Sequence, residues 1–538
     1  MFRYFKKVLP LAAALLLVGC SESKNKTSDS DISAINPDST TASENFDTSD
    51  DLSIPLLSIE TVNQAENVLD FVTKPVTRHV AESIASWTPN YQMPPEPYYE
   101  ACKITLTDTD NTVLLSGIDA QVKARGNWTT TYDKKALKIK FAQKQNMLGL
   151  NDGAQMKNWL LLAEYKDASM LRNKTALSIA SEILEKDGLY TSDAEFVEVR
   201  INNEYWGVYL LAEMQQINPD RVNITDALQG YTGTDIGYFM EFDGYFVNEP
   251  ELQQFRVDYA DNAPLIPFDG NNGSGKTMQC LGDDKNDIGI SIKNDIYAQE
   301  QKDFISGFVN DVYKIMYYAA YEDKAYVFNP EFTEISEDTS ITSEEAVKRV
   351  VDVNSLADMY IISELTCDAD IYWSSFYMSA DFGAEGTKKL VFEAPWDFDS
   401  AMGNKDRCAD GTGFYAANIV PDVNGGPEGN GEYVTINPWL AVIIYEDWFQ
   451  DIIKEKWTEA YDSGVFERAY SLIESDKERC ALAFERNYKK WNNIINNDSF
   501  AMELSEKAAN CKTQAEAADY LSEWLKSRVE FLNSNWHK

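Results

Sequence analysis

Histidine is nearly absent from this sequence, and its absence narrows the chemistry open to the protein. The 538 residues include two histidines, His79 and the near-terminal His537. A zinc or iron site built on imidazole needs more than these, and a Ser-His-Asp triad would have to rest on His79. The cysteines form no C-x-x-C pair, which disfavours a cysteine zinc cluster. Any catalysis must therefore use carboxylates, lysines and hydroxyls.

Positive charge is also scarce. The chain has 48 Lys and Arg against 87 Asp and Glu, a formal net charge of −39. Such a surface repels polyanions, which excludes nucleic acid as a partner and disfavours docking on anionic lipid headgroups. The cysteines beyond Cys20 are widely spaced, and they permit either disulfides in an oxidising compartment or isolated buried thiols.

Long hydrophobic runs are missing except at the N-terminus. Basic residues there precede an apolar run over residues 8–18, which is short for a membrane span and typical of a signal peptide. The run ends in Leu17-Val-Gly-Cys20, so we predict a lipoprotein signal peptide over residues 1–20, with Cys20 as the lipidated residue. The alternative is an ordinary secretory signal with a chance cysteine.

The next two segments have little to bury. Residues 21–52 are rich in Ser, Asp and Thr and predict a disordered tether, and residues 53–99 form a lead-in segment with several prolines. No later stretch is apolar enough to cross a bilayer, so the lipid is expected to be the only membrane attachment. The predicted location is the cell envelope, at the outer membrane or cell surface, on the periplasmic or extracellular face.

From about residue 100 the pattern changes to short strands and then to helices. Residues 136–141 alternate, with Leu137, Ile139 and Phe141 on one face and lysines on the other. Periodicity and turn residues give the other predicted elements. They are a buried strand or the start of a short helix at 159–163, hairpins at 196–212 and 376–392, helices at 167–184 and 298–321, one or two helices at 343–365, and helices over most of 438–536. The fold class is therefore α+β, strand-rich first and helical later.

Several sequence blocks carry a resemblance when taken together and in order. They are Lys123-Ala-Arg-Gly-Asn127 with Lys138-Ile-Lys-Phe141, Leu148-Gly-Leu150, Lys157-Asn-Trp-Leu-Leu161, Met170-Leu-Arg-Asn-Lys174, Phe196-Val-Glu-Val-Arg200, Tyr205-Trp-Gly-Val-Tyr-Leu-Leu-Ala-Glu213, Glu364-Leu-Thr-Cys-Asp-Ala-Asp370, Pro395-Trp-Asp-Phe-Asp399 and Tyr520-Leu-Ser-Glu-Trp-Leu-Lys-Ser-Arg528. The set resembles the CotH family of kinase-like spore-coat proteins, from about residue 100 to 535.

The resemblance implies an atypical protein-kinase-like fold with two lobes. Its core would span residues 100–404, and residues 405–538 would form the helical C-terminal part of the same domain. The implied activity is that of an exported Ser/Thr kinase, which uses ATP with Mg²⁺ or Mn²⁺ to phosphorylate surface or envelope proteins.

The same resemblance assigns the acidic residues of a site. Asp370 matches the family's catalytic aspartate, and Asp397 matches its metal-binding aspartate. Asp399 lies two residues further on and is a second candidate metal ligand. Phosphoryl transfer needs carboxylates in both roles, one to orient the attacking hydroxyl and one to hold a cation. Without the resemblance, a helix-capping or solvated aspartate is the favoured interpretation of Asp370, and a pair of turn aspartates is the alternative for Asp397 and Asp399.

A nucleotide site also needs a cation and a contact for the base. Lys140 is our candidate for the phosphate-binding lysine, since it lies on the strand face opposite the apolar residues. Lys138 would serve equally by alternation, and a solvated lysine is the plain alternative. Glu213 ends an apolar strand and is a candidate contact for adenine.

One position departs from the kinase pattern. Kinases place an asparagine, a ligand of the second metal, five residues after the catalytic aspartate, and this chain has Ser375 there. A catalytically weak module that binds envelope proteins or polysaccharide therefore stays open. So does a glycoside-acting enzyme that uses Asp370 and Asp397 as paired carboxylates.

Gly270-Asn-Asn-Gly-Ser-Gly-Lys-Thr277 matches the P-loop pattern letter for letter. A working P-loop follows a buried strand and opens a helix. Here Pro264 and Pro267 precede the pattern, and the residues after Thr277 do not begin a helix. We interpret this segment as a surface loop.

Overall fold

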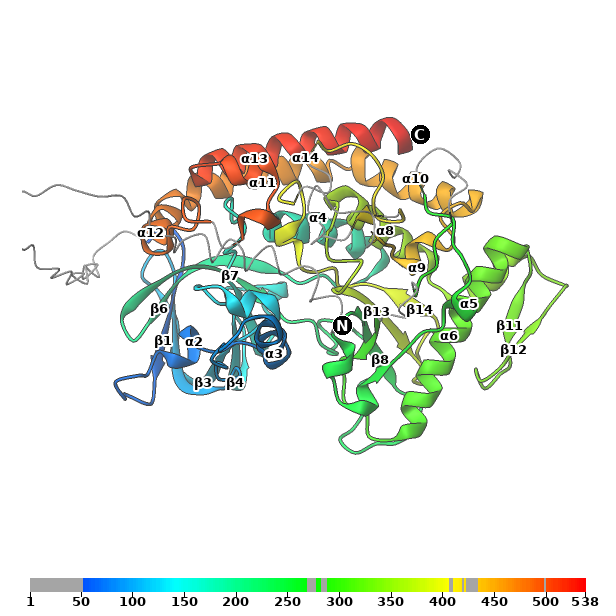
Figure 1. Cartoon of the computed structure of the whole chain (residues 1–538), viewed down its shortest axis with the longest axis horizontal. Coiled ribbons are helices and arrows are strands. Elements are labelled where there is room, and N and C mark those ends of the chain that lie inside the picture. Colours follow the sequence, from blue (N-terminus) through cyan, green and yellow to red (C-terminus); the bar gives the residue numbers. More distant parts are fainter. Residues whose placement is uncertain are drawn as a thin grey trace, which may run out of the picture.

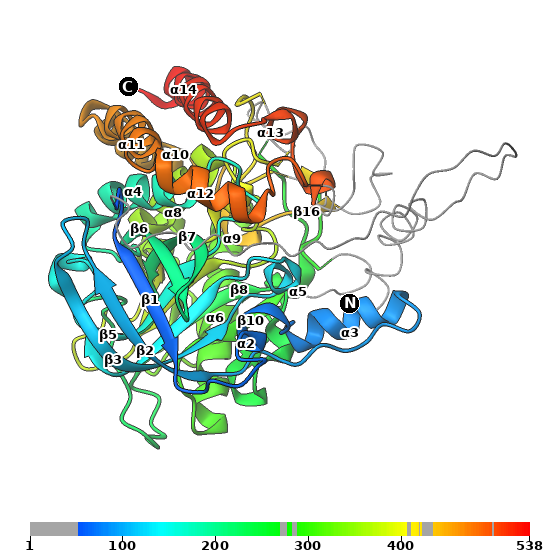
Figure 2. The same ribbon diagram turned by 90° about the vertical axis from the view of Figure 1, so that its left-hand side faces the viewer.

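The structure is a computed structural model, and it describes residues 52–268, 277–281, 288–405, 410–418, 420–421, 434–497 and 500–538. Cys20 and nearly all of the predicted tether lie outside these residues. Figure 1 shows a strand barrel on the left and a mixed part on the right, with helices α11 and α14 running along the top of the molecule. Figure 2 shows the same helices lying above the barrel.

The first third of the described chain forms a closed barrel in the order β1-β2-β3-β4-β5-β7-β6. Alternating side chains fill its interior, as in Leu137, Ile139 and Phe141, which are all buried. The strands are β1 (Leu56–Thr61), β2 (Glu100–Thr107), β3 (Val113–Ala124), β4 (Leu137–Gln145), β5 (Met156–Leu162), β6 (Ala194–Ile201) and β7 (Glu204–Glu213).

Strand β1 comes from the segment that the sequence set apart as a lead-in. It pairs antiparallel with β2 and parallel with β6, so it closes the barrel. Helices α2 (Asp70–Thr73) and α3 (Arg78–Trp87) follow it. The predicted hairpin over residues 196–212 is confirmed as β6 and β7, with Asn202 and Asn203 at positive φ in the turn.

The second part is built on a five-stranded sheet in the order β14-β13-β8-β10-β9. Its core is continuous with that of the helices around it. The strands are β8 (Gly237–Asp243), β9 (Gln254–Phe255), β10 (Gly289–Ile292), β13 (Phe376–Asp381) and β14 (Leu390–Phe392), and the larger helices are α4 (Arg172–Leu184), α6 (Gln299–Glu322), α7 (Ser343–Val350) and α8 (Val353–Thr366).

The C-terminal part is helical, as predicted. Its helices are α9 (Pro438–Ala441), α10 (Asp447–Asp462), α11 (Val465–Arg479), α12 (Ala481–Trp491), α13 (Glu506–Asn510) and α14 (Gln514–Trp536). Short elements complete the chain: α5 (Tyr259–Asn262), β11 (Tyr326–Phe328), β12 (Ile335–Glu337), β15 (Val420–Pro421) and β16 (Val434–Thr435). The α+β class is thus confirmed. Across the described residues, no helix has the length and apolar character that a membrane crossing requires.

Candidate functional site

Three aspartates from two loops of the second part lie close together. Asp370 sits in the turn that follows α8, and Asp397 and Asp399 lie in the loop after β14. Burial raises the pKa of Asp397 well above its usual range, and the carboxylates of Asp370 and Asp399 raise it further. Asp397 is therefore a buried carboxyl with two like charges near it.

Asn173, in the first turn of α4, holds the backbone beside Asp397. Its Oδ1 accepts the amide of Phe398 at 2.8 Å, while its Nδ2 donates to Glu164 at 3.0 Å. Asp397 itself has a left-handed backbone, with φ of 74°. A non-glycine residue keeps such a conformation only where its surroundings impose it, and here the bond from the Phe398 amide to Asn173 holds the adjacent backbone.

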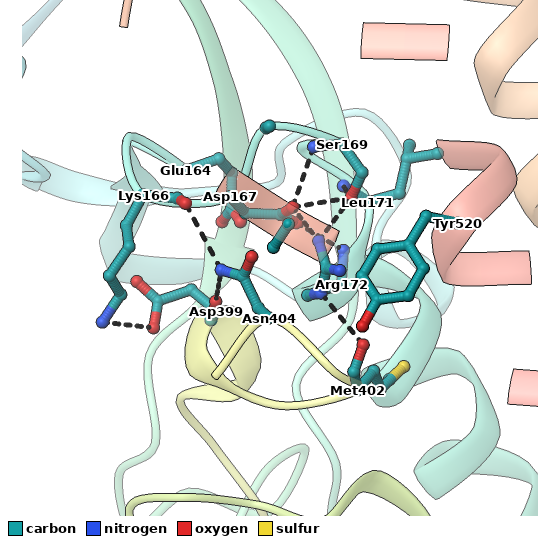
Figure 3. A network of polar contacts seen from close by, with 12 residues as sticks. Glu164, Lys166, Asp167, Ser169, Leu171, Arg172, Asp399, Met402, Asn404 and Tyr520 are labelled. Atoms are coloured by element: carbon teal, nitrogen blue, oxygen red, sulfur yellow. Dashed lines mark hydrogen bonds and ion pairs between the residues drawn. The ribbon is translucent and has the colours of Figure 1, made fainter. Parts of the chain in front are cut away.

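Lys166 is the cation nearest to these aspartates in the loop between β5 and α4. Its Nζ lies 3.4 Å from Oδ1 of Asp399 and 3.6 Å from Oε2 of Glu503, and its side chain is buried. Burial disfavours the charged amine, but the carboxylates of Asp399 and Glu503 raise the pKa of Lys166 well above its ordinary value. Figure 3 shows the ammonium pointing at the Asp399 carboxylate.

The same loop is joined to the aspartate loop by a buried polar network (Figure 3). The Arg172 guanidinium is paired with Asp167, and its Nε donates to the carbonyl of Ala401 at 3.2 Å. Asn404 donates to the backbone oxygens of Asp399 at 2.7 Å and of Lys166 at 3.3 Å. These bonds fix the β5–α4 loop, and with it Lys166, against the loop that carries Asp397 and Asp399.

The barrel contributes a group of cations, Lys123, Arg125 and Lys138. Lys123 and Lys138 are directly opposite each other on β3 and β4. Burial lowers the pKa of Lys138 to about 8, and repulsion from Lys123 and Arg125 adds to the effect. Within the described residues, no carboxylate forms an ion pair with either lysine. Arg125 also lowers the pKa of Asp397, which places this group within electrostatic reach of the aspartates.

The two lysine candidates of β4 are not placed alike. Lys138 is half-buried within the cation group, whereas Lys140 is exposed further along the same face. The charge of Lys140 still contributes to lowering the pKa of Lys138. Lys138 therefore lies deeper in the group than Lys140, and a nucleotide contact by either lysine stays a prediction.

Glu213 is fully buried at the end of β7, and protein groups already engage its carboxylate. Arg221 pairs with Oε1 at 2.9 Å, and Asn151 donates to the same oxygen at 3.0 Å. The hydroxyl of Tyr190 lies 3.3 Å from Oε2, and the amide of Asp193 lies 3.2 Å from it. In this geometry the side chain ties the end of β7 to its neighbours, and its contact with adenine stays a prediction.

Ser375 is buried and has a left-handed backbone, with φ of 63°. Its amide donates to Oε1 of Glu241 on β8 at 2.8 Å. The other oxygen of Glu241 lies 2.7 Å from Nζ of Lys293. The position that departs from the kinase pattern is thus held by a carboxylate that is itself paired with a lysine.

The residues present fit a divalent cation bound together with phosphates. In the described part of the chain, no group of three or more His, Cys, Asp or Glu side chains has the geometry of a complete metal cage. Mg²⁺ needs no such cage, since it takes one or two carboxylates and completes its shell with phosphate oxygens and water. Asp397 lies among like charges and within electrostatic reach of Arg125, and a metal–phosphate complex can neutralise charges of both signs.

The P-loop pattern lies outside the described residues except for Thr277. On its flanks, Leu265 and Met278 exchange two backbone hydrogen bonds as an isolated bridge. Residues 277–281 contain no helical turn. The described flanks therefore lack the strand and helix that a P-loop requires.

Sequence reasoning missed Lys166, Asn173, Arg125 and the Glu241–Lys293 pair as parts of the site. Arg125 and Asn173 stand inside blocks that carried the resemblance, and Lys166 lies between two of them. The signal that could have identified these three residues is their position within or beside the blocks that carry the family resemblance. Glu241 lies on β8 and Lys293 directly follows β10, in segments with no distinguishing pattern, so only the fold reveals them.

These features define an α+β protein in which a cluster of carboxylates in one part lies within electrostatic reach of Arg125, at the end of barrel strand β3. The chain belongs to the CotH family: residues 122–532 match the family described as CotH kinase protein. The inner spore coat protein H of Bacillus subtilis (strain 168) is 34% identical over 96 residues, which are 18% of this chain and 24% of that protein. The chain therefore matches about a quarter of that relative's length.

Proposed function

We propose that this chain is an atypical Ser/Thr protein kinase with a two-lobed, kinase-like arrangement. It would transfer the γ-phosphate of ATP to proteins of the cell envelope or surface, and a lipid on Cys20 would anchor it to the membrane. The observation that carries the proposal is the grouping of Asp397 with Asp370 and Asp399, within electrostatic reach of Arg125, which also acts on Lys138. Membership of the CotH family supports it.

Each residue has a role in this proposal. Asp370 accepts the proton of the attacking hydroxyl, because it lies beside the other carboxylates and is the less buried position in its turn. Asp397 and Asp399 hold Mg²⁺ or Mn²⁺, which when bound neutralises charge on the phosphate oxygens. Arg125 and Lys138 bind the phosphates, and Lys166 keeps Asp399 ionised and in position.

The test is a thermal unfolding series on the full-length protein, with and without ATP and Mn²⁺. A ligand that binds only the folded state adds about 2.7 kcal/mol at a hundred times its Kd. We expect ATP and Mn²⁺ together to raise the unfolding midpoint of the wild type, and Asp397→Asn to lose this increase. Asp311→Asn, a half-buried aspartate on α6, is the control and should retain it.

A second candidate function rests on Ser375. A hydroxyl is a poorer metal ligand than an amide oxygen, which favours a catalytically weak module that binds envelope proteins or polysaccharide. If millimolar ATP with Mn²⁺ leaves the wild-type midpoint unchanged, the kinase proposal fails and the binding module takes its place.

A further inference from the structure

Lys293 is a cation that the roles assigned above do not use. It follows β10 directly, and its Nζ lies 2.7 Å from Glu241, 3.5 Å from Asp243 and 3.5 Å from Glu249. Its side chain is 23% exposed, so the ammonium is largely withdrawn from water. One fixed positive charge therefore serves three carboxylates beside β8 and β10, two inner strands of the five-stranded sheet.

This group is bonded directly to the catalytic turn. Glu241 binds Lys293 through one oxygen and accepts the amide of Ser375 through the other, at 2.8 Å. Ser375 lies five residues after Asp370. The two oxygens of the Glu241 carboxylate thus bind the Lys293 ammonium and the Ser375 backbone amide.

Tyr377 shows that the Lys293 group and the metal-binding aspartates border the same region. Its ring stacks on Phe239 at 5.4 Å between centroids. Burial raises the pKa of its phenol, the carboxylates of Glu241, Asp243 and Asp397 raise it further, and Arg125 opposes them. The charges of Glu241 and Asp243 and those of Asp397 and Arg125 therefore act on the same phenol.

In two-metal phosphoryl transfer, the second ion is held by an amide five residues after the catalytic aspartate and by the metal-binding aspartate. This chain has Ser375 at that position, which offers no side-chain amide. Glu241 accepts the backbone amide of Ser375 and is paired with Lys293. We infer that Lys293 supplies the fixed positive charge that a second divalent ion supplies elsewhere, so that the site takes one divalent ion, at Asp397. The inference rests on the proposed kinase function.

The experiment counts the metal ions bound to each chain, which does not require turnover. Full-length protein in detergent is dialysed to equilibrium against Mn²⁺ and a non-hydrolysable ATP analogue, and bound Mn²⁺ per chain is measured. We expect one Mn²⁺ in the wild type and two in Lys293→Gln, which removes the charge and retains a hydrogen-bond donor. Lys293→Arg keeps the charge and should bind one.

Lys314→Gln is the matched control. Lys314 is 27% exposed and lies between Asp258 and Asp311, but it stands on α6. It should leave the count at one. A count of two in the wild type, or of one in folded Lys293→Gln, would overturn the inference and leave the kinase proposal standing. A wild-type count of zero would overturn both.

Ser375→Asn keeps the question answerable if Lys293→Gln does not fold. This variant adds the amide ligand while Lys293 remains in place. One Mn²⁺ per chain in Ser375→Asn supports the inference, because the fixed charge still excludes a second ion. Two would show that the missing amide alone limits the metal count, and would overturn the role given to Lys293.

Discussion

At the scale of single residues, the site brings together charges that a protein interior normally separates. Asp397 is surrounded by carboxylates, and Lys138 is surrounded by cations. Both arrangements cost free energy in the protein alone, because burial disfavours each charge and like neighbours repel it. A metal–nucleotide complex carries both signs of charge, so it would relieve both costs at once.

The two lysines of β4 provide a direct comparison. We expect Lys138→Met to weaken ATP binding about tenfold or more, because a charge-assisted hydrogen bond contributes about 1.5–3 kcal/mol. Lys140→Met should have little effect, since Lys140 is exposed and water screens its charge. Calorimetric titration of both variants with ATP and Mn²⁺ measures the difference. The reverse order would return the role to Lys140.

Residue patterns predicted the acidic half of the site better than the basic half. Asp370, Asp397 and Asp399 stand in two short blocks, and the structure brings them together. The alternation of β4 could not separate Lys138 from Lys140 as the phosphate-binding lysine, because a period of two places both on one face. Only the barrel decides which of them is covered by neighbouring strands.

At the scale of elements, a fully buried ion pair joins α14 to α8. Nη2 of Arg528 lies 2.6 Å from Oε1 of Glu364, and its Nε donates to the Glu364 carbonyl at 3.1 Å. Glu364 also accepts the amides of Tyr415 and Ala416, at 2.7 and 2.9 Å. The pair fixes the end of the helix that leads into Asp370.

Removing the arginine should therefore destabilise the fold. We expect Arg528→Met to lower the free energy of unfolding by about 3–5 kcal/mol, because it leaves Glu364 buried without its cation. Urea unfolding measures the change. Arg468→Met, which removes an exposed pair with Glu182 between α11 and α4, should leave the urea midpoint nearly unchanged. Equal effects of the two variants would contradict this view of the buried pair.

The type of each element could be predicted from the sequence more readily than its boundaries, and the start of α4 shows why. The helical spacing suggested a helix over residues 167–184, and α4 begins at Arg172. The Asp167 carboxylate accepts the amide of Arg172 and pairs with its guanidinium, and the backbone of Met170 has a φ of 60°. These residues form the loop that positions Lys166, so tertiary contacts overrode the local helical pattern.

At the scale of the whole molecule, the chain joins a closed barrel to a mixed sheet-and-helix part. The lead-in, set apart by its prolines, enters the barrel as β1 between β2 and β6. A strand that pairs with distant neighbours leaves no local signal of its partners, since register and closure depend on segments more than forty residues away.

The predicted lipid anchor belongs to this scale too. We expect the wild-type protein to fractionate with membranes and to incorporate a labelled fatty acid, and Cys20→Ser to lose the label and the membrane association. Without the lipid, the described residues offer no membrane-crossing helix to replace it. Cell fractionation with metabolic labelling checks both expectations. A labelled Cys20→Ser protein would place the lipid elsewhere.

The sequence by itself determined the class of fold, the family and the acidic motifs, because these depend on residues close together along the chain. Periodicity separates strands from helices. A contiguous block such as Pro395-Trp-Asp-Phe-Asp399 can be recognised from the sequence without knowing where it lies in the fold. The tertiary structure alone decided which charges meet. Lys166 pairs with Asp399, Arg125 lies within electrostatic reach of Asp397, and Lys293 is joined to the Ser375 backbone through Glu241. These residues are far apart along the chain, and electrostatic interaction depends on distance in space.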